Sequence, residues 1–393
     1  MSEKRSLVEL RFTDGRVITS TTSLELSERF LDPIDTRRAT IIPSQDRRAS
    51  ANELLQKGEV VWVYVDGKAQ SALMIQSVTR TVGTGGVIYG IDCVSPMQIL
   101  AESTVDVPNA TKVLSSDAPV LDFVASLVAP LGFTEVQDSG DVAFLKAKTG
   151  VNPKSTATAG NAARQKDCRA EYNETNLQFI NRVLSRLGCM LRCFTSDAGV
   201  ALYITAPHYD GEPLYTLSQA PQGQGAAGED AFFGDVRVTD SNADQYSRCV
   251  VVGATTDEDA ATRANEPKAE ALTTDISASR PPFRSSFFFP HKEVFFKDEH
   301  AGNQARARSV AKHVLGRRAE RAFMVQGTVR GLVSSRGIPW TVDTLCRVRL
   351  PLLGIDEVMW ISERTMRQDA RGGQTTSLTL IPKGYVVLGD IGS

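Results

Sequence analysis

The sequence FMVQGTVRGLVSSRGIPWTVDTLCRVRLPLLGIDEVMWISERTMRQDARGGQTTSLTLIP, residues 323–382, decides the fold. Apolar and polar residues alternate along it with the period of two that is typical of half-buried β-strands, and glycine and proline interrupt the runs. The pattern predicts four strands, at 323–333, 344–350, 357–367 and 374–382. Gly372-Gly373 predicts a tight hairpin turn between the last two strands.

The first 105 residues carry the same kind of pattern and are predicted to form a first, β-rich domain. The run EVVWVYV (59–65) is followed by Asp66-Gly67 and by a second run at 72–82. Asp-Gly between two alternating apolar runs is a strong hairpin signal. Val87–Val94 adds another strand, and residues 95–101 predict a short helical turn at the end of this domain.

Residues 106–217 are predicted to form a small α+β middle domain. Two helical patterns lie in it, at 117–131 and 176–187, and each stops at a glycine, Gly132 or Gly188. A hairpin is predicted after the second helix, from runs at 189–195 and 200–205. The apolar face of the first helix is Val120, Val124, Leu127 and Leu131 with Asp117 as N-cap, and that of the second is Leu177, Ile180, Leu184 and Leu187. The polar segment 149–169 between the helices is predicted to be a surface loop or a segment that becomes ordered only on assembly.

The last predicted domain, residues 218–393, opens with a linker rich in Gly, Gln and Ala. Strands are predicted at 234–240 and 246–254, and the polar segment 255–278 is predicted to be a loop. A long helix is predicted at 299–322, with the apolar stripe Ala307, Val310, Ala311 and Val314 facing the protein. A burst of phenylalanines precedes it, at Phe287, Phe288, Phe289, Phe295 and Phe296. Core filling is the simpler reading of this burst, and a subunit interface is the alternative.

Composition narrows the classes of function. The chain has 44 basic and 46 acidic side chains and a net charge of −2, so there is no global positive field to hold nucleic acid. No run of about 18 apolar residues occurs, and the start MSEKRSLVELRF lacks the apolar stretch of a signal peptide. The six scattered cysteines, Cys93, Cys168, Cys189, Cys193, Cys249 and Cys346, indicate thiols in a reducing cytoplasm, with an intermolecular disulfide left open.

Candidate catalytic or metal-binding residues do not form a working set. The four histidines, His208, His291, His300 and His313, include no HxxxH or HExxH pair. Neither a GxSxG elbow nor a GxxxxGK[ST] phosphate loop occurs. Gly83, Gly85 and Gly86 lie between two strand-like runs without a following helix, so they predict a hairpin turn. Asp138 and Asp141 are read as solvated turn residues and not as a glycosidase pair.

One charged feature remains, on the predicted helix at 299–322. Arg306, Arg308, Lys312, Arg317, Arg318 and Arg321 lie beside Glu299 and Glu320. The simpler interpretation is a solvated helix face with ion pairs. An inter-subunit or lumen-facing surface is the alternative.

Three segments together resemble a known family. They are 303–388, which joins the Ala/Arg-rich helix to the four closing strands; 51–103, ANELLQKG through MQILAES; and 172–207, YNETNLQ through YITAP. The chain is similar to the phage Mu-type baseplate hub, which is related to the hubs of contractile tails and to the first part of type VI secretion spike proteins. The matching positions are Arg321, Gly327, Gly337, Trp340, Val348, Ile361, Gly372, Gly373, Leu378 and Leu380.

The resemblance implies an α+β, β-rich fold in which two tail-tube-like β-barrel domains (1–105 and 218–393) flank and enclose the small α+β domain (106–217). It implies a homotrimer whose six barrels match a six-fold tail tube above and a three-fold spike below. The implied partners are the tail tube protein, the central spike protein and other baseplate or tape-measure proteins. DNA would pass through the lumen without specific binding, and no membrane partner is implied.

The same resemblance implies a structural protein of the virion tail baseplate, assembled in the bacterial host cytoplasm, with no catalytic residue, metal or cofactor. Two alternatives come from other classes of function. One is a tail-tip cell-wall hydrolase, for which no catalytic set stands out. The other is a carbohydrate-binding adhesion module, which would need exposed aromatic platforms. Trp62, Trp340 and Trp360 all lie in strand or turn patterns that predict packing.

Overall fold

The structure of the protein is a computed structural model. It describes residues 5–19, 21–32, 36–41, 55–83, 86–106, 120–138, 170, 173–185, 189–196, 199–219, 229–241, 248–253, 268–272, 293–298, 311, 314–315, 322–369 and 373–383.

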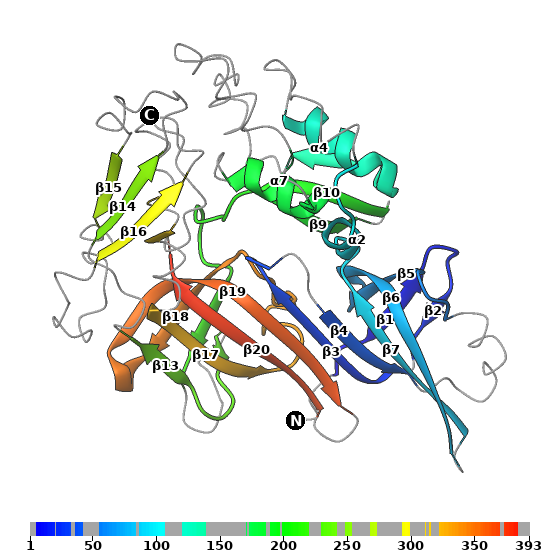
Figure 1. Cartoon of the computed structure of the whole chain (residues 1–393). Coiled ribbons are helices and arrows are strands. Elements are labelled where there is room, and N and C mark those ends of the chain that lie inside the picture. The colour runs from blue at the N-terminus through cyan, green and yellow to red at the C-terminus, as the bar shows by residue number, and fades with distance from the viewer. Residues whose placement is uncertain are drawn as a thin grey trace.

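One large sheet of 14 strands contains strands from both ends of the chain (Figure 1). Its order is β12-β11-β18-β19-β3-β4-β7-β6-β5-β1-β2, and β20, β17 and β13 continue from the other edge of β19. The strands are β1 (Val8–Phe12), β2 (Val17–Ile18), β3 (Thr21–Arg29), β4 (Thr36–Ile41), β5 (Val60–Val65), β6 (Lys68–Gly83), β7 (Gly86–Val94), β11 (Tyr215–Ser218), β12 (Asp230–Ala231), β13 (Arg237–Asp240), β17 (Phe323–Arg330), β18 (Leu345–Leu350), β19 (Ile355–Asp369) and β20 (Gly373–Pro382).

Strand β19 is shared by the two halves of this sheet. Along one edge, its residues Ile355–Trp360 pair with β18, and its residues Glu363–Asp369 pair with β3. The other edge pairs with β20 from Met359 to Asp369, with a register shift between Ile361 and Glu363. A bulge gives a strand extra twist and a bend, so it fits the point where β19 changes partner. The first and last segments of the chain are therefore joined by main-chain hydrogen bonds.

The carboxyl-terminal strands form a ring of pairings. The ring runs β11-β18-β19-β20-β17, and β12 pairs with β11. Phe232, the residue after β12, forms a bridge with Val329 of β17 and so returns the path to its start. Phe232 is buried, and its ring lies directly over Gly327 of β17.

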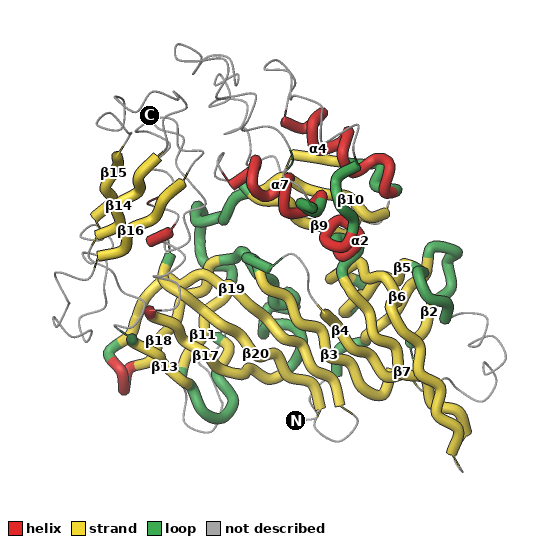
Figure 2. Tube along the Cα trace, in the orientation of Figure 1, coloured by secondary structure: helices red, strands yellow, loops and turns green. Residues whose placement is uncertain are grey.

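The amino-terminal strands form a curled antiparallel sheet in the order β3-β4-β7-β6-β5-β1-β2 (Figure 2). The predicted Asp66-Gly67 hairpin is confirmed: it joins β5 to β6, and both residues have positive φ, 49° and 75°, as a type I′ turn requires. The predicted hairpin at Gly83–Gly86 is also confirmed, because these two glycines pair with each other at the tip of β6 and β7.

A small α+β unit packs on this curled sheet. It contains α2 (Gln98–Glu102), α4 (Val120–Val128), the short turn η2 (Ala129–Leu131), β8 (Val136–Asp138), α7 (Asn176–Ser185), β9 (Met190–Ser196) and β10 (Gly199–Thr205). Val124 and Leu127 of α4 and Ile180 and Leu184 of α7 are buried in its core, as predicted, and Gly132 ends η2 with a positive φ. Asp117, Leu187, Gly188 and the whole of 149–169 lie outside the described residues.

A second small sheet, β15-β14-β16, lies beside the large one (Figure 1). Its strands are β14 (Arg248–Gly253), β15 (Lys268–Leu272) and β16 (Glu293–Asp298). The prediction of a loop over 255–278 was wrong at β15, because main-chain pairing with β14 holds a polar segment in a strand. Ala311 and Leu315, described as helical within the predicted helix 299–322, are buried against Cys249 and Val251. The rest of that helix, apart from Val314 and Ala322, lies outside the described residues, as do Phe287–Phe289.

The predicted β-rich fold with a small helical unit is thus confirmed, and its sheets are curled. The closing four strands occur as predicted, within a few residues of the expected bounds. The structure adds a feature that the sequence did not predict. Strands β3 and β19 pair with each other and so join the amino-terminal and carboxyl-terminal β-rich segments in one sheet.

Gly327→Ala is expected to lower the free energy of unfolding by about 1–3 kcal/mol, the usual cost of overpacking. A Cβ at this position would lie well inside van der Waals contact of the Phe232 ring, which closes the carboxyl-terminal ring of strands. The matched control is Gly90→Ala in β7, where the new Cβ would be 3.7 Å from Thr79. Urea denaturation should show the control unchanged or up to about 1 kcal/mol more stable. Equal losses at both positions would contradict this account of Gly327.

Candidate functional site

The histidines and acidic residues weighed in the sequence form no site in the described part of the chain. His208 is exposed, and its backbone N–H donates to Asp343. His291, His300, His313 and Asp141 lie outside the described residues, and the side chain of Asp138 at the end of β8 is not described. No group of three or more His, Cys, Asp or Glu side chains in the described ranges could hold a metal ion.

The remaining candidates have structural positions. Cys93, Cys189, Cys193, Cys249 and Cys346 carry no disulfide, and burial raises the pKa of the Cys346 thiol far above its usual range. Trp340 and Trp360 are fully buried, which confirms their predicted packing role. The basic run at 306–321 falls on residues that the structure does not describe, apart from helical Ala311, Val314 and Leu315. Among the described helices, none combines the length and apolar character needed to cross a bilayer.

The most unusual feature of the described residues is a buried ion cluster, here called the ionic junction: Glu28, Arg192 and Arg364. The Arg364 guanidinium lies 2.8 Å from Glu28 Oε2 through both Nε and Nη2. Arg192 Nη2 lies 2.8 Å from the other carboxylate oxygen, Oε1. The side chains of Arg364, Arg192 and Glu28 are only 2%, 6% and 16% exposed. Fully buried charges are rare unless paired, so this cluster has a specific role in the fold.

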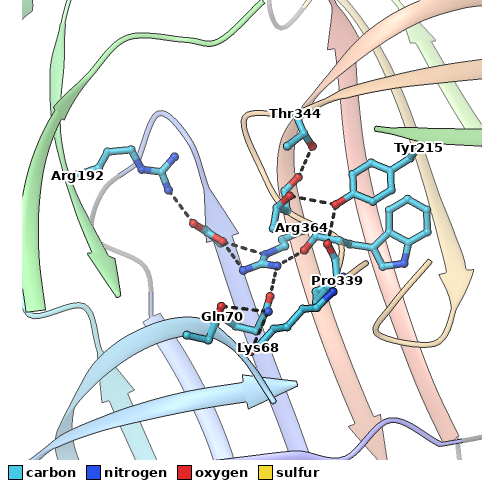
Figure 3. A network of polar contacts seen from close by, with 11 residues as sticks. Lys68, Gln70, Arg192, Tyr215, Pro339, Thr344 and Arg364 are labelled. Atoms are coloured by element: carbon cyan, nitrogen blue, oxygen red, sulfur yellow. Dashed lines mark hydrogen bonds and ion pairs between the residues drawn. The ribbon is translucent and has the colours of Figure 1, made fainter. Parts of the chain in front are cut away.

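The ionic junction is built from three parts of the chain (Figure 3). Glu28 lies on β3, Arg364 lies on β19, and Arg192 lies on β9 of the small α+β unit. Glu28 and Arg364 are direct cross-strand partners in the β3–β19 ladder, so the sheet register places them opposite each other. Arg192 reaches the same carboxylate from β9. One carboxylate therefore links the amino-terminal sheet, the carboxyl-terminal strands and the helical unit.

Arg364 has two further acceptors that extend the network. Its Nη1 donates to Gln70 Oε1 at 2.8 Å and to the main-chain oxygen of Trp340. Gln70 lies on β6, and Trp340 lies on the connection between β17 and β18. A guanidinium has five N–H donors in a planar fork, which suits several fixed acceptors at once. The fork is thus used to tie together segments that are distant in sequence.

Aromatic rings surround the ionic junction. Arg192 lies over the ring of Phe30 at 4.6 Å, and Phe30 packs edge-on against Trp360 at 5.0 Å between ring centroids. On the other side, Trp340 packs on Tyr215 at 4.5 Å. The Tyr215 hydroxyl donates to the Pro339 carbonyl at 2.6 Å. These rings exclude water and strengthen the electrostatic attraction between the charged groups.

Asp343 is a half-buried acidic group near the junction. Its backbone has a positive φ of 61°, and its Oδ1 accepts hydrogen bonds from the Trp360 indole N–H at 2.9 Å and the His208 backbone N–H at 2.7 Å. Burial raises the pKa of this carboxyl to about 6. The group holds the connection between β17 and β18 against Trp360.

The chemistry of the junction is that of a structural joint. Both oxygens of its one carboxylate are occupied by guanidinium groups, Oε2 by Arg364 and Oε1 by Arg192. No Ser, Cys or His side chain belongs to the described network around it. An open depression of about 250 Å³ lies elsewhere, and its lining includes Arg5, Thr21, Gln368, Asp369 and Gln374. Asp369 is its one carboxylate, and its lining holds no histidine, cysteine or second carboxylate to form an acid–base pair.

Comparison with known proteins identifies the fold. The sequence matches no protein-family model, and no curated protein matches it. Solved structures do match. The tail protein from Neisseria meningitidis MC58 is similar over 98% of this chain and 98% of its own, with a TM-score of 0.70 and 16% sequence identity. The 43 kDa tail protein of prophage MuSo2 from Shewanella oneidensis is similar over 97% and 99%, with a TM-score of 0.68 and 14% identity.

The chain has a phage tail protein fold. A third structure with this fold, the prophage tail protein gp18 from Listeria monocytogenes EGD-e, is similar over 96% of this chain and 95% of its own, with a TM-score of 0.53 and 10% identity. The family resemblance inferred from the sequence is thereby confirmed at the level of the fold. Six of the ten positions that carried it, Gly327, Trp340, Val348, Ile361, Leu378 and Leu380, are core or ring-closing residues of this tail protein fold. Gly337 and Gly373 have positive φ, and Arg321 and Gly372 lie outside the described residues.

Sequence reasoning missed the ionic junction. A signal for Arg364 exists in the strand pattern. It lies two residues from Ser362 and from Met366, which are both buried, and alternate residues of a strand share a face, so its side chain points inward. A charged residue at an inward strand position predicts a buried partner. The identity of that partner could not be read from the strand itself, because Glu28 is 336 residues away.

Glu28→Gln is expected to lower the free energy of unfolding by about 3 kcal/mol or more, because it leaves two buried guanidiniums without their carboxylate. The matched control is Glu25→Gln, which removes the partner of Arg367 on the same two strands, where the side chains are 49% and 58% exposed. The control should cost under about 1 kcal/mol. Urea denaturation of both variants measures the difference, and equal effects would contradict the role given to the junction.

Asp343→Asn is expected to flatten the dependence of stability on pH. The folded pKa of about 6 lies above the ordinary 3.8, so the folded state binds the proton more tightly between these two values. This carboxyl therefore stabilises the fold fully below about pH 4 and loses that contribution as pH rises through 6. Asparagine keeps the acceptor and tolerates positive φ. The variant should match the wild type near pH 4 and exceed it by up to about 3 kcal/mol at pH 8, measured by urea denaturation; a constant difference would contradict the assignment.

Proposed function

We propose that this chain is the structural hub of a contractile phage tail baseplate, or of a tail-derived injection machine. The observation that carries the proposal is the likeness to two phage tail proteins over nearly the whole of both chains, at TM-scores of 0.70 and 0.68. Whole-length similarity supports a role for the complete architecture and not for one grafted domain. No catalytic set among the described residues points to a competing activity.

The proposed assembly is a homotrimeric ring around a lumen. In the proposal, residues 1–105 and 218–393 form two tail-tube-like β-barrel domains that flank the α+β domain 106–217. Three copies then present six barrels, which adapts a six-fold tube to a three-fold spike. The side-by-side placement of two curled β units on one shared strand, β19, supports this arrangement.

The ionic junction supports a role that needs a fixed angle between the two β units. A hub under load from a contracting tail must transmit force without bending between its halves. The β3–β19 ladder joins the units by main-chain hydrogen bonds, and Arg364 adds charge-assisted bonds to three separate segments. Such a joint is of little use to an adhesion module whose domains act independently.

The proposed partners are the tail tube protein, the central spike protein and other baseplate or tape-measure proteins, with DNA passing through the lumen without specific binding. The proposed location is the baseplate of the virion tail, assembled in the host cytoplasm. The net charge of −2 fits a channel that does not grip DNA, because each basic contact to phosphate would slow its passage.

The test is the mass and symmetry of the purified full-length chain. Sedimentation velocity should give the mass of three copies, and negative-stain imaging should show closed particles with three-fold symmetry and a central channel. A parallel turbidity assay on purified peptidoglycan should show no lysis. A strict monomer at high concentration would contradict the ring, and clear lysis would replace the structural role with the hydrolase.

A further inference from the structure

The hairpin of β6 and β7 extends beyond the rest of its sheet (Figure 1). Strand β5 pairs with β6 only from Lys68 to Met74, and β4 pairs with β7 only from Tyr89 onward. Beyond those points β6 and β7 pair only with each other among the described residues, out to Gly83 and Gly86. We call residues 76–83 and 86–88 the ribbon.

The ribbon has the properties of a surface that another strand covers. Its outer β6 edge runs from Gln76 to Gly83, roughly 25 Å of main chain at 3.4 Å per residue. Val82 is 80% exposed and Ile88 is 40% exposed. An isolated two-stranded ribbon is marginally stable in water, and an unpaired strand edge is a template for pairing with another chain.

A second open edge lies at the opposite end of the large sheet. Strand β13 (Arg237–Asp240) pairs with β17 on one side and with no other strand in the described part of the chain. Figure 1 shows β13 and the ribbon at opposite sides of the molecule. In the part of the chain that the structure describes, one copy therefore carries two distinct open edges on opposite sides of the molecule.

The two edges have complementary charge. Arg80 is the one charged residue of the ribbon. The β13 edge carries Asp235 and Asp240 against the single basic residue Arg237. Arg80, Asp235 and Asp240 are all exposed. Opposite charges on facing strands stabilise a pair, and like charges oppose it.

We propose that the β6 edge of the ribbon in one copy adds as a strand to the open edge of β13 in the next copy. The contact is heterologous, with different surfaces on the two partners, and repeating it generates a ring if the rotation closes. It deepens the proposed ring function, on which it rests, by naming the two surfaces that join neighbouring copies. Main-chain hydrogen bonds supply the affinity, and Arg80 facing the acidic edge supplies the orientation.

The first test shortens the ribbon. Arg80 and Tyr89 already face each other across the hairpin, so Thr81–Ile88 can be replaced by Asn-Gly, the preferred two-residue turn. The variant should keep the wild-type circular dichroism spectrum and sediment as a monomer under conditions where the wild type assembles. Assembly of the shortened variant at wild-type strength would overturn the proposed contact.

The second test exchanges charges and so does not depend on a deletion. Arg80→Glu and Asp240→Arg should each weaken self-association by about two- to five-fold per contact, as exposed pairs do, and the chain carrying both should recover. The controls are Arg5→Glu, near the Asp66-Gly67 end of β5 and β6, and Glu212→Lys, which reverse exposed charges away from both edges and should leave the mass unchanged. Failure of the double variant to recover, with each single variant weakened, would overturn the facing of Arg80 and the acidic edge.

The possible outcomes distinguish a failure of this contact from a failure of the proposed hub function. A ring that persists in the shortened variant overturns the contact and leaves the hub role standing. Assembly that depends on the ribbon but gives open filaments in negative stain supports the contact and counts against the closed ring. A wild-type chain that stays monomeric overturns both.

Discussion

The architecture depends on one strand that serves two sheets. Strand β19 gives one edge first to β18 and then to β3, while β20 covers its other edge. A change of partner along one edge brings the ends of β18 and β3 to the same place, and their side chains must fill it. The bulge next to Ser362 supplies the bend, and Phe30 and Asp343 donate backbone N–H groups to the Ser362 and Ile361 carbonyls there. The ionic junction lies immediately beyond this point, at Arg364.

The parts of the fold that the sequence predicts are those fixed by neighbours in the chain. Asp66-Gly67 and Gly83–Gly86 are local turns whose residues alone favour positive φ or close pairing, and both hairpins occur. The helical patterns at 120–128 and 176–185 are likewise periodic within one segment. Strand β15 was missed because the alternation of Lys268–Leu272 is only five residues long, uses small alanines and lies within a polar segment, and pairing with β14 holds it as a strand.

The parts that the sequence does not predict are pairings between distant segments. Glu28 and Arg364 are 336 residues apart, and nothing in either strand specifies the other. The resemblance to tail hubs supplied the general arrangement but not the reason for its matching positions. The structure gives that reason for two of them. Gly327 admits the Phe232 ring that closes the carboxyl-terminal strands, and Trp340 presents its carbonyl oxygen to Arg364 while its ring packs on Tyr215.

A buried ion pair is a weak device for stability alone, because apolar residues of similar volume often stabilise as well or better. Its advantage here is geometric. Apolar surfaces tolerate small rotations, but the Arg364 fork is satisfied only when Glu28, Gln70 and the Trp340 carbonyl occupy fixed directions around it. Arg192 adds a fourth direction, from the helical unit. A protein whose copies must close into a ring tolerates little error in the angle between its halves, since each error is repeated at every contact. The ionic junction therefore supports the function proposed for this chain. It fixes the orientation of the two β units, which in the proposed ring leaves one arrangement of neighbours for the edges at their far ends.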